Sequence, residues 1–323
     1  MIRSKSMIKV HANDGISQSG VQALEKAGYS VSTTKVAQEQ LVNYINQESI
    51  SVLLVRSATT ARKDLIDACP GLKIIGRGGV GLDNIDVDYA RSKGLHVINT
   101  PAASSASVAE LVFAHLYGGV RFLHQSNRAM ALEGDTNFGS LKKAYAKGRE
   151  LRGKTLGIIG FGRIGKAVAQ IALGSGMRVV YFDQYVPSAT INLKFYDQQE
   201  LNFELTGSTF DAVLAESDFI TLHVPAQKDY VIGADELSKM KAGSGLINAA
   251  RGGVVDEVAL IEALESRHLS FAAMDVFENE PTPAVQVLMN EYCSLSPHIG
   301  AATNEAQDRI GEELAAQIID LTA

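Results

Sequence analysis

The segment GIIGFGRIGKAV, residues 157–168, continues an apolar run into Gly160, Gly162 and Gly165. This G-x-G-x-x-G spacing is typical of a tight turn from a strand into a helix, where free backbone N–H groups hold a dinucleotide pyrophosphate. The motif lies in the middle of the chain, with 156 residues before the segment. A nucleotide-binding domain that begins here leaves the first half of the chain for another purpose.

Both halves of the sequence alternate short apolar runs with amphipathic segments. The strand-like runs include IKVHA, SVLLVRS, LKIIGRG and LHVINTP in the first half, and TLGIIGFG, MRVVYFD, FITLHVP and SGLINAA in the second. Strands that alternate strictly with helices pair in parallel, with the helices as crossover connections. The sequence therefore predicts an α/β protein with two doubly wound parallel sheets.

A helix-like segment joins the two blocks. Ser107 suits its N-cap, while Gly118 and Gly119 predict a kink or a close helix contact. A second unusual segment runs from Asp183 to Asp218 and is longer than most strand-to-strand connections. We expect it to hold an extra hairpin or an ordered surface loop, closed by a helix.

The position of the last motif suggests how the domains are arranged. After His298 the chain has room for one amphipathic helix, so we expect no regulatory domain there. We predict that residues 104–298 form a cofactor domain, inserted into a substrate domain made of residues 1–103 and 299–323. The first block then supplies the substrate half of a cleft.

Composition excludes several classes of function. The 323 residues carry a formal net charge of -6 without blocks of like charge, which disfavours nucleic acid or an anionic membrane as a partner. No window reaches the ~18 apolar residues of a membrane span, and the N-terminus lacks a targeting pattern. Cys69 and Cys293 have neither disulfide nor zinc spacing, so no metal site and a reducing cytoplasm are expected.

The strand that follows the glycine motif indicates which dinucleotide binds. MRVVYFD ends in Asp183, 18 residues after Gly165. A carboxylate at this place accepts hydrogen bonds from the adenine ribose hydroxyls and repels a 2'-phosphate. The sequence therefore predicts NAD rather than NADP as the cofactor.

Three further polar clusters each follow an apolar strand. They are INAARGGVVDE with Arg251, MDVFENEP with Asp275 and Glu280, and SPHIGAAT with His298. Their place after strands puts them at the carboxyl edge of the sheet, where open α/β folds bind ligands. Taken singly, each also fits a bland role as a surface ion-pair partner, a loop residue or a cap.

Taken together, these motifs resemble the D-2-hydroxyacid dehydrogenase family. The resemblance is carried by VRSAT at 55–59, GRGGVGLDNID at 76–86, LGIIGFGRIG at 156–165, NAARGGVVDE at 248–257, MDVFENEP at 274–281 and SPHIGAAT at 296–303. It implies a Rossmann cofactor domain inserted into a flavodoxin-like substrate domain, with NAD and a small 2-hydroxy acid as ligands. It also implies a homodimer to which the helix around 108–123 contributes.

The resemblance assigns roles in the reaction. It implies that Arg251 binds the substrate carboxylate and C2 oxygen, that His298 is the acid/base, and that Glu280 is its carboxylate partner. Asp275 would contact the nicotinamide carboxamide. The chemistry fits these roles, because an imidazole exchanges protons near neutral pH and a guanidinium matches a carboxylate.

The GRGGVG segment has two interpretations. It lacks the Lys-Ser or Lys-Thr pair of a phosphate loop, so one interpretation is a glycine-rich turn after a buried strand. The family resemblance implies instead that backbone N–H groups around Gly79 and Val80 hold the substrate carboxylate. In that case Arg56, Ser57 and Arg77 lie toward the far end of the substrate, and two arginines suit a phosphate there.

The remaining site residues fall into two groups. The residues expected to contact the cofactor are Gly160, Gly162, Arg163, Ile164, Gly165, Asp183, His223, Pro225, Ala250, Asp275 and His298. His223 lacks a carboxylate partner in its motif, so its ring is expected to be structural. The other histidines show no metal-ligand spacing and are expected to be structural as well, namely His11, His96, His115, His124 and His268.

The resemblance implies the NAD-dependent oxidation of 3-phospho-D-glycerate to 3-phosphohydroxypyruvate, the entry step of serine biosynthesis. Because we expect no regulatory domain after the last helix, we also expect no feedback inhibition by serine through such a domain. One alternative is another 2-hydroxyacid reaction with the same mechanism, on hydroxypyruvate, glyoxylate or D-lactate. An alternative of a different class is an NAD-sensing corepressor without catalysis, because a fold alone does not determine function.

Overall fold

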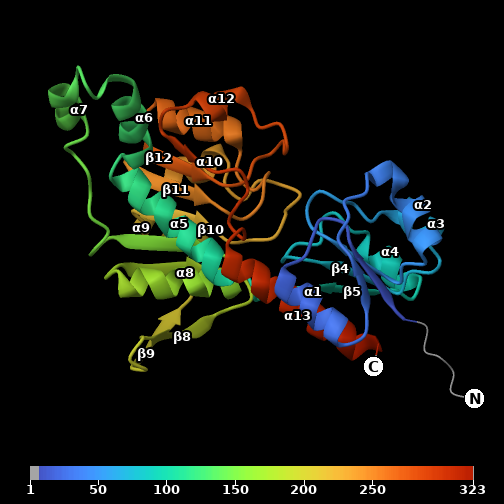
Figure 1. The fold of residues 1–323 in the computed structure, drawn as a ribbon. Coiled ribbons are helices and arrows are strands. Elements are labelled where there is room, and N and C mark those ends of the chain that lie inside the picture. Colours follow the sequence, from blue (N-terminus) through green and yellow to red (C-terminus); the bar gives the residue numbers. More distant parts are fainter. Residues whose placement is uncertain (1–6, 323) are drawn as a thin grey trace, which may run out of the picture. The chain divides into compact units, whose positions relative to one another are not determined.

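The computed structural model describes residues 7–322. Residues 1–6, where the sequence predicts no targeting signal, lie outside that range. The chain forms two compact units: one ends at Ser104 and resumes at Ala301, and the other runs from Ser105 to Gly300. The first unit therefore combines the blue N-terminal elements of Figure 1 with its red C-terminal helix. The expected boundaries after residues 103 and 298 lie one and two residues earlier.

The first unit is built on a five-stranded parallel sheet in the order β2-β1-β3-β4-β5. Its strands are β1 Lys9–Ala12, β2 Ser30–Ser32, β3 Val52–Val55, β4 Ile74–Arg77 and β5 His96–Asn99. Its helices are α1 Gln18–Lys26, α2 Gln38–Glu48, α3 Lys63–Ala68, α4 Val87–Ser92 and α13 Asn304–Thr322. This strand order is the flavodoxin-like form of a doubly wound sheet, so the predicted fold class of this unit is confirmed.

The two faces of this sheet separate along single strands. In β3, Leu53 and Val55 pack under α2, α3 and α4, whereas Val52 and Leu54 pack under α1 and α13. This alternation is the two-residue period of a strand buried on both faces. The late helix α13 therefore completes the core of the first unit.

The second unit is built on a six-stranded parallel sheet in the order β13-β12-β11-β10-β6-β7. Its sheet strands are β6 Thr155–Ile159, β7 Arg178–Phe182, β10 Phe219–Leu222, β11 Ser244–Asn248, β12 Leu269–Met274 and β13 Cys293–Leu295. Its helices are α5 Ser105–Val120, α6 Leu123–Glu133, α7 Phe138–Ala144, α8 Arg163–Gly174, α9 Phe210–Glu216, α10 Ala234–Lys239, α11 Glu257–Glu265 and α12 Val285–Met289. The order reverses between β6 and β10, which is where doubly wound folds bind nucleotides.

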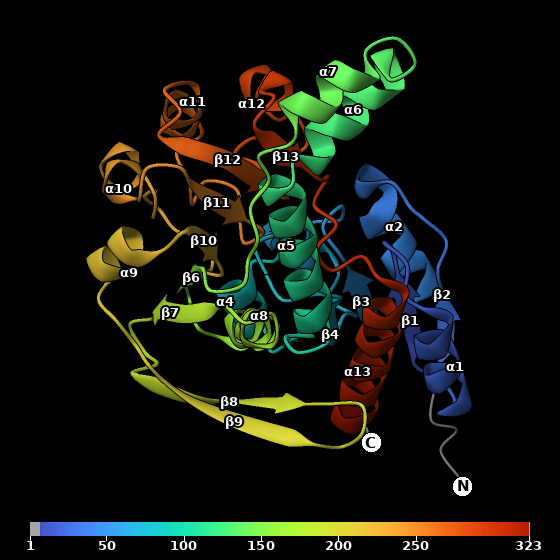
Figure 2. The same ribbon diagram turned by 90° about the vertical axis from the view of Figure 1, so that its left-hand side faces the viewer.

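The long segment after Asp183 forms an antiparallel hairpin of its own. Its strands are β8 Ser188–Lys194 and β9 Glu200–Thr206, and Figure 2 shows them running side by side. Ile191 and Leu193 of β8 are buried in the same core as side chains of α8. The prediction of an extra hairpin is confirmed, and so is the closing helix, α9.

The helix that opens the second unit differs from the sequence prediction. α5 begins at Ser105, and Ser107 lies buried inside its first turn, so the predicted N-cap is wrong. The chain stays helical through both glycines and breaks at Phe122, which has a left-handed φ of 56°. Gly119 instead allows a close contact, because an added Cβ would lie 2.4 Å from the ring of Phe271. Of the two predicted alternatives at these glycines, the structure shows the close contact, which here is made with β12.

Within residues 7–322, no helix is long and apolar enough to cross a membrane. In the same range, the structure contains no group of three or more histidine, cysteine, aspartate or glutamate side chains arranged to hold a metal ion. Cys69 and Cys293 are free thiols, and both are buried.

Candidate active site

The three glycines after β6 have separate structural reasons. Gly160 has φ of 91°, and an added Cβ would lie 2.4 Å from the carbonyl oxygen of His223. An added Cβ on Gly165 would lie 2.3 Å from the carbonyl oxygen of Gly160, so this glycine brings α8 close to the turn. At Gly162 an added Cβ would meet no described atom within 4 Å, which leaves space beside the start of α8. A tight turn, an open approach and a free helix N-terminus fit a dinucleotide pyrophosphate.

Asp183 follows β7, the neighbour of β6, and faces this turn. Its Oδ2 accepts a hydrogen bond from the N–H of Phe161 at 2.7 Å, and its Oδ1 accepts one from the N–H of Tyr185 at 2.8 Å. Each carboxylate oxygen can accept about two hydrogen bonds, so capacity remains for ribose hydroxyls. The residues present therefore fit an adenine dinucleotide.

His223 follows β10, at the point where the strand order reverses. Its Nε2 is 3.0 Å from Thr221 Oγ1, and its Nδ1 is buried without a hydrogen-bond partner among residues 7–322. Burial lowers the pKa of His223 to about 3, so the ring is neutral near neutral pH. Its backbone carbonyl lies against the turn at Gly160, and its ring is unsuited to acid/base chemistry near neutral pH.

The remaining predicted cofactor residues lie close to these strand ends. Arg163 and Ile164 form the first turn of α8, Pro225 is exposed shortly after β10, and Ala250 is buried after β11.

Arg251 lies on a short turn after β11 that its own neighbours hold. The Asn248 side chain donates from Nδ2 to the Arg251 carbonyl at 3.0 Å and accepts from the Ala250 N–H at 3.1 Å. One guanidinium nitrogen of Arg251 donates to the Ala250 carbonyl at 2.6 Å. The next residue, Gly252, packs so closely that an added Cβ would lie 1.8 Å from the Phe277 carbonyl. The turn after β11 is thereby fixed against the loop after β12.

Glu280 and His298 form a hydrogen-bonded pair. Nδ1 of His298 lies 2.7 Å from Oε2 of Glu280, while Oε1 of Glu280 accepts from the Phe277 N–H at 3.1 Å. A carboxylate at Nδ1 favours a proton on that nitrogen, which leaves Nε2 to exchange protons with a ligand. The structure thus brings together two of the predicted reaction residues in the arrangement that acid/base catalysis requires.

Asp275 holds the main chain on the C-terminal side of His298. Its Oδ1 accepts from the Ile299 N–H at 2.9 Å and its Oδ2 from the Gly300 N–H at 2.9 Å. Its Oδ1 also accepts from the Ser296 hydroxyl at 2.6 Å. His298 itself has a left-handed φ of 54°, a conformation that non-glycine residues rarely adopt. These hydrogen bonds to the buried Asp275 carboxylate fix the segment that carries His298. The predicted nicotinamide contact of Asp275 stays a prediction.

A cavity of about 390 Å³ borders the Glu280–His298 pair. Its other walls are mainly apolar, with side chains of Phe277, Leu288 and Leu295 among them. The pair itself stays accessible to solvent and ligand, because the side chains of His298 and Glu280 are 42% and 36% exposed.

The predicted substrate residues other than Arg251 belong to the first unit. They lie at the ends of the adjacent strands β3 and β4: Arg56 and Ser57 follow β3, Arg77 ends β4, and Gly79 and Val80 come after it. Gly79 has φ of 145°, and an added Cβ would lie 2.5 Å from a guanidinium nitrogen of Arg77. The cation of Arg77 therefore lies against the glycine-rich turn. The Val80 carbonyl accepts from the Asn99 side chain at 2.7 Å. This turn is held from the neighbouring strand.

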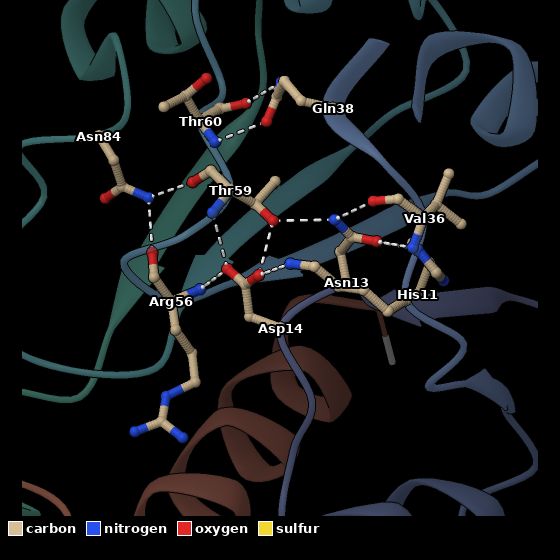
Figure 3. Close-up of polar contacts among 10 residues, drawn as sticks. His11, Asn13, Asp14, Val36, Gln38, Arg56, Thr59, Thr60 and Asn84 are labelled. Carbon is tan, nitrogen blue, oxygen red and sulfur yellow. Dashed lines mark hydrogen bonds and ion pairs between the residues drawn. The ribbon is translucent and has the colours of Figure 1, made fainter. Parts of the chain in front are cut away.

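Sequence reasoning missed Asp14, which holds the loop that contains Arg56 and Ser57. Asp14 follows β1, and its side chain is only 5% exposed. It accepts from the backbone N–H groups of Arg56 at 2.7 Å and Thr59 at 3.0 Å, from the Thr59 hydroxyl at 2.7 Å, and from Lys35. Figure 3 shows these bonds, with the Arg56 guanidinium pointing away from them. The signal was present, because Asp14 comes two residues after a strand, at the carboxyl edge of the sheet.

Burial by itself would raise the pKa of Asp14. The hydrogen bonds from Lys35, Arg56 and Thr59 outweigh burial and hold its pKa below the ordinary value of 3.8. The carboxylate is therefore ionised at neutral pH, in the form that accepts these hydrogen bonds.

The family model of the D-isomer specific 2-hydroxyacid dehydrogenase NAD-binding domain matches residues 113–300. The chain belongs to the D-2-hydroxyacid dehydrogenase family. The resemblance drawn from the sequence motifs is thereby confirmed. The second unit of this dehydrogenase is an NAD-binding domain, and the predicted cofactor, NAD, is confirmed as well.

Relatives that match nearly the whole of this dehydrogenase chain carry different substrate names. The chain is 40% identical to a hydroxypyruvate reductase from Thermotoga maritima, over 96% of this chain and 97% of the relative. It is 37% identical to a D-3-phosphoglycerate dehydrogenase from Methanocaldococcus jannaschii, over 97% of this chain and 57% of that longer relative. A D-lactate dehydrogenase from Aquifex aeolicus, solved with NAD and lactic acid, matches with a TM-score of 0.75 and 29% identity, over 97% of this chain and 95% of that one.

Proposed function

We propose that this dehydrogenase oxidises 3-phospho-D-glycerate to 3-phosphohydroxypyruvate, the opening step of serine biosynthesis, with NAD as the hydride acceptor. The observation that carries a dehydrogenase reaction is the pair of His298 and Glu280, joined at 2.7 Å. The choice of substrate is supported by sequence motifs that resemble those of short-form D-3-phosphoglycerate dehydrogenase and by two arginines in the substrate loops.

In this proposal the chain's own residues handle the proton. Glu280 keeps the Nδ1 proton of His298 in place, so Nε2 takes the proton of the C2 hydroxyl as the alcohol is oxidised. Bound NAD supplies the hydride acceptor. In the reverse direction the same imidazole returns the proton to the C2 oxygen. Glu280 stabilises the imidazolium that His298 becomes while it holds the proton from the C2 hydroxyl.

Arg251 is proposed to orient the substrate. A guanidinium offers a planar fork of donors that matches a carboxylate, and it stays charged throughout. Its anchorage on the Ala250 carbonyl and on the turn closed by Asn248 limits its side-chain freedom before substrate binds. A preordered donor loses less conformational entropy on binding.

The phosphate is proposed to bind Arg56 and Arg77. The Arg77 guanidinium lies against the turn at Gly79, and that of Arg56 extends away from the bonds that hold its loop. The apolar cavity beside Glu280 is poorly suited to a dianion, because burying a charge without a partner is costly.

A second candidate is hydroxypyruvate reduction. The relative from Thermotoga maritima carries that name and matches nearly its whole length, at 40% identity. The two substrates differ in the tail, so the same His298, Glu280 and Arg251 serve both. An uncharged hydroxymethyl tail would use the two arginines less.

We also propose that the protein is a homodimer. Among the described residues, none in α6 is buried, and Leu132 and Phe138 are 85% and 60% exposed. Both views show α6 and α7 protruding from the second unit (Figures 1 and 2). Large apolar side chains exposed on a protruding helix pair favour a contact with another protein chain. The apolar face of α5, by contrast, lies in the core of its own unit. Light scattering tests this, and Leu132→Asp should give a monomer.

The cytoplasm is the proposed location, because two free thiols fit a reducing compartment.

The test follows NADH absorbance with 3-phospho-D-glycerate, D-glycerate, D-lactate and, in the reducing direction, hydroxypyruvate and glyoxylate. The proposal predicts the highest kcat/KM for 3-phospho-D-glycerate. In Arg77→Gln, kcat/KM should fall by about 10- to 100-fold for that substrate, since a hydrogen bond to a charged group is lost, and change little for D-glycerate. Higher activity on hydroxypyruvate would favour the second candidate. No turnover of any of these would favour an NAD-sensing binding protein.

A further inference from the structure

His115 lies in α5 with only 8% of its surface exposed, and both of its ring nitrogens contact serines. Nδ1 is 2.8 Å from Ser294 Oγ, and Nε2 is 2.8 Å from Ser296 Oγ. These serines lie in β13 and just after it, and they are nearly as buried as His115. A histidine on the buried face of a helix is thereby tied to the strand that leads into His298.

The direction of these hydrogen bonds follows from the proton count. A serine hydroxyl has one proton, and that of Ser296 goes to Asp275 at 2.6 Å, because a carboxylate only accepts. Ser296 therefore accepts from His115, which requires a proton on Nε2. In the neutral ring Nδ1 is then an acceptor and takes the proton of Ser294. Each polar atom of the chain from Ser294 through His115 and Ser296 to Asp275 has a partner.

Burial lowers the pKa of His115, while the charge of Asp275 acts in the opposite direction and His124 acts in the same direction as burial. The neutral tautomer with its proton on Nε2 fits both serine contacts. The ring of His298 is held separately, by Glu280 at its Nδ1. Among the described residues, His115 is thus connected to the main chain around His298, and not to its imidazole.

The main chain around His298 needs such support. His298 has a left-handed φ of 54°, and its N–H bonds to the Ser296 carbonyl at 3.1 Å. Asp275 holds Ile299 and Gly300 on one side of it and Ser296 on the other. An uncommon backbone conformation persists only where the surroundings fix it. Ser296, which donates to Asp275, is in turn hydrogen-bonded to His115 of α5.

We propose that His115 is a positioning residue for the reaction, which through Ser296 and Asp275 fixes the main chain of residues 296–300 and thus the place of His298. The proposal rests on the proposed acid/base role of His298. It gives a function to a histidine whose sequence context is an apolar helix.

The test compares two substitutions at one site. His115→Leu removes both ring nitrogens, whereas His115→Gln keeps an N–H donor at nearly the same place for Ser296. His115→Leu should lower kcat by about 10- to 100-fold, the range expected when a reacting group is slightly misplaced, with KM for NAD little changed. His115→Gln should restore most of kcat. The matched control is His268→Leu. His268 lies just before the amino end of β12, is part-buried, and contacts the Leu237 carbonyl through Nε2.

A second readout does not depend on turnover. Amide hydrogen exchange at Ile299 and Gly300 should be faster in His115→Leu than in the wild type, and close to the wild type in His115→Gln and in His268→Leu. Ser296→Ala should reproduce the effect of His115→Leu, and the double variant should add little, because both act through one path. Circular dichroism checks that each variant is folded at the assay temperature.

The possible outcomes are distinct. If the wild type turns over no 2-hydroxy acid, the proposed function fails, and amide exchange still decides the positioning role. Equal losses of kcat in His115→Leu and His115→Gln would overturn the proposal, because packing alone would then explain them. Exchange at Ile299 and Gly300 that stays at the wild-type rate in His115→Leu would also overturn it.

Discussion

Two loops at strand ends, one in each unit, are held by a buried aspartate in the same manner. Asp14 follows β1 and accepts from the backbone N–H groups of Arg56 and Thr59. Asp275 follows β12 and accepts from those of Ile299 and Gly300. At the carboxyl edge of a parallel sheet, a carboxylate on one strand can collect the N–H groups of the loop after another strand.

The two aspartates differ in how their charge is balanced. Asp14 has a cation partner in Lys35, whose own side chain is 59% exposed. The contacts described for Asp275 are with neutral donors. One of these donors, the Ser296 hydroxyl, is itself hydrogen-bonded to His115. The first loop is thus held by a carboxylate that also pairs with an exposed cation, and the second by a carboxylate within a buried network of neutral donors. The first carries proposed substrate contacts and the second the proposed acid/base, so the two should affect different kinetic constants.

The largest effect is expected at the residue that the second loop carries. His298→Ala should lower kcat by about 10²- to 10⁴-fold, because the proton acceptor is lost. The NAD dissociation constant, measured by fluorescence titration, should change little. A loss of only a few-fold in kcat would remove the acid/base role and with it the distinction between the loops.

Asp275→Asn should have the next largest effect. An amide has one acceptor oxygen where the carboxylate has two, so either Ile299 or Gly300 faces an N–H donor. We expect kcat to fall by about 100-fold at saturating NAD, which is the cost of misplacing a reacting group by about 1 Å. An unchanged kcat would show that the loop keeps its place without the carboxylate.

Asp183 extends the comparison to a third strand end, where it holds the N–H groups of Phe161 and Tyr185. Asp183→Ser removes the charge that repels a 2'-phosphate, so the ratio of kcat/KM for NAD over NADP should fall by about 10-fold or more. An unchanged ratio would contradict the assignment of Asp183 to the adenine ribose.

Asp14→Asn should act on stability in a manner that depends on pH. Because the pKa of Asp14 is lower in the folded protein than its ordinary value of 3.8, the carboxylate stabilises the fold above that value. This contribution is lost as the pH falls through the folded pKa. Urea unfolding at pH 7 should therefore show the variant to be about 1 to 3 kcal/mol less stable, and the difference should narrow below about pH 4. A difference independent of pH would rule out the carboxylate as its source.

The smallest effect is expected for Lys35→Met. Lys35 is exposed, and surface ion pairs contribute about 0 to 1 kcal/mol to the free energy of unfolding. Added salt should reduce even this difference. Lys239→Met, which breaks the exposed pair with Asp211, is the matched control. A loss at Lys35 well above that of the control would mean that the Asp14 charge needs its cation.

Much of the fold was accessible from sequence because its determinants are local. The alternation of apolar runs predicted both parallel sheets, and the spacing of Gly160, Gly162 and Gly165 predicted a turn whose glycines are each required by a close contact, a left-handed φ or open space. The prediction of the α5 start failed, because Ser107 is a good N-cap by type but lies on the buried face of the helix.

The supporting residues were harder to predict because their partners are distant in sequence. His115 lies 179 and 181 residues before the serines that it contacts. Nothing in the sequence of an apolar helix indicates that both of its ring nitrogens have hydrogen-bond partners. Asp14 lies 42 residues before Arg56, although its place after a strand was a usable signal. Side chains that hold a loop are set by tertiary packing, which periodicity does not reveal.

The most direct test of the two-loop comparison is to measure kcat and KM for the 2-hydroxy acid in Asp14→Asn and Asp275→Asn, side by side at saturating NAD and pH 7. If each aspartate acts through its own loop, Asp14→Asn raises KM by about 10-fold and keeps kcat, since one charged hydrogen-bond network is weakened. Asp275→Asn then lowers kcat and keeps KM. Parallel changes in the same constant for both variants would contradict this division of roles.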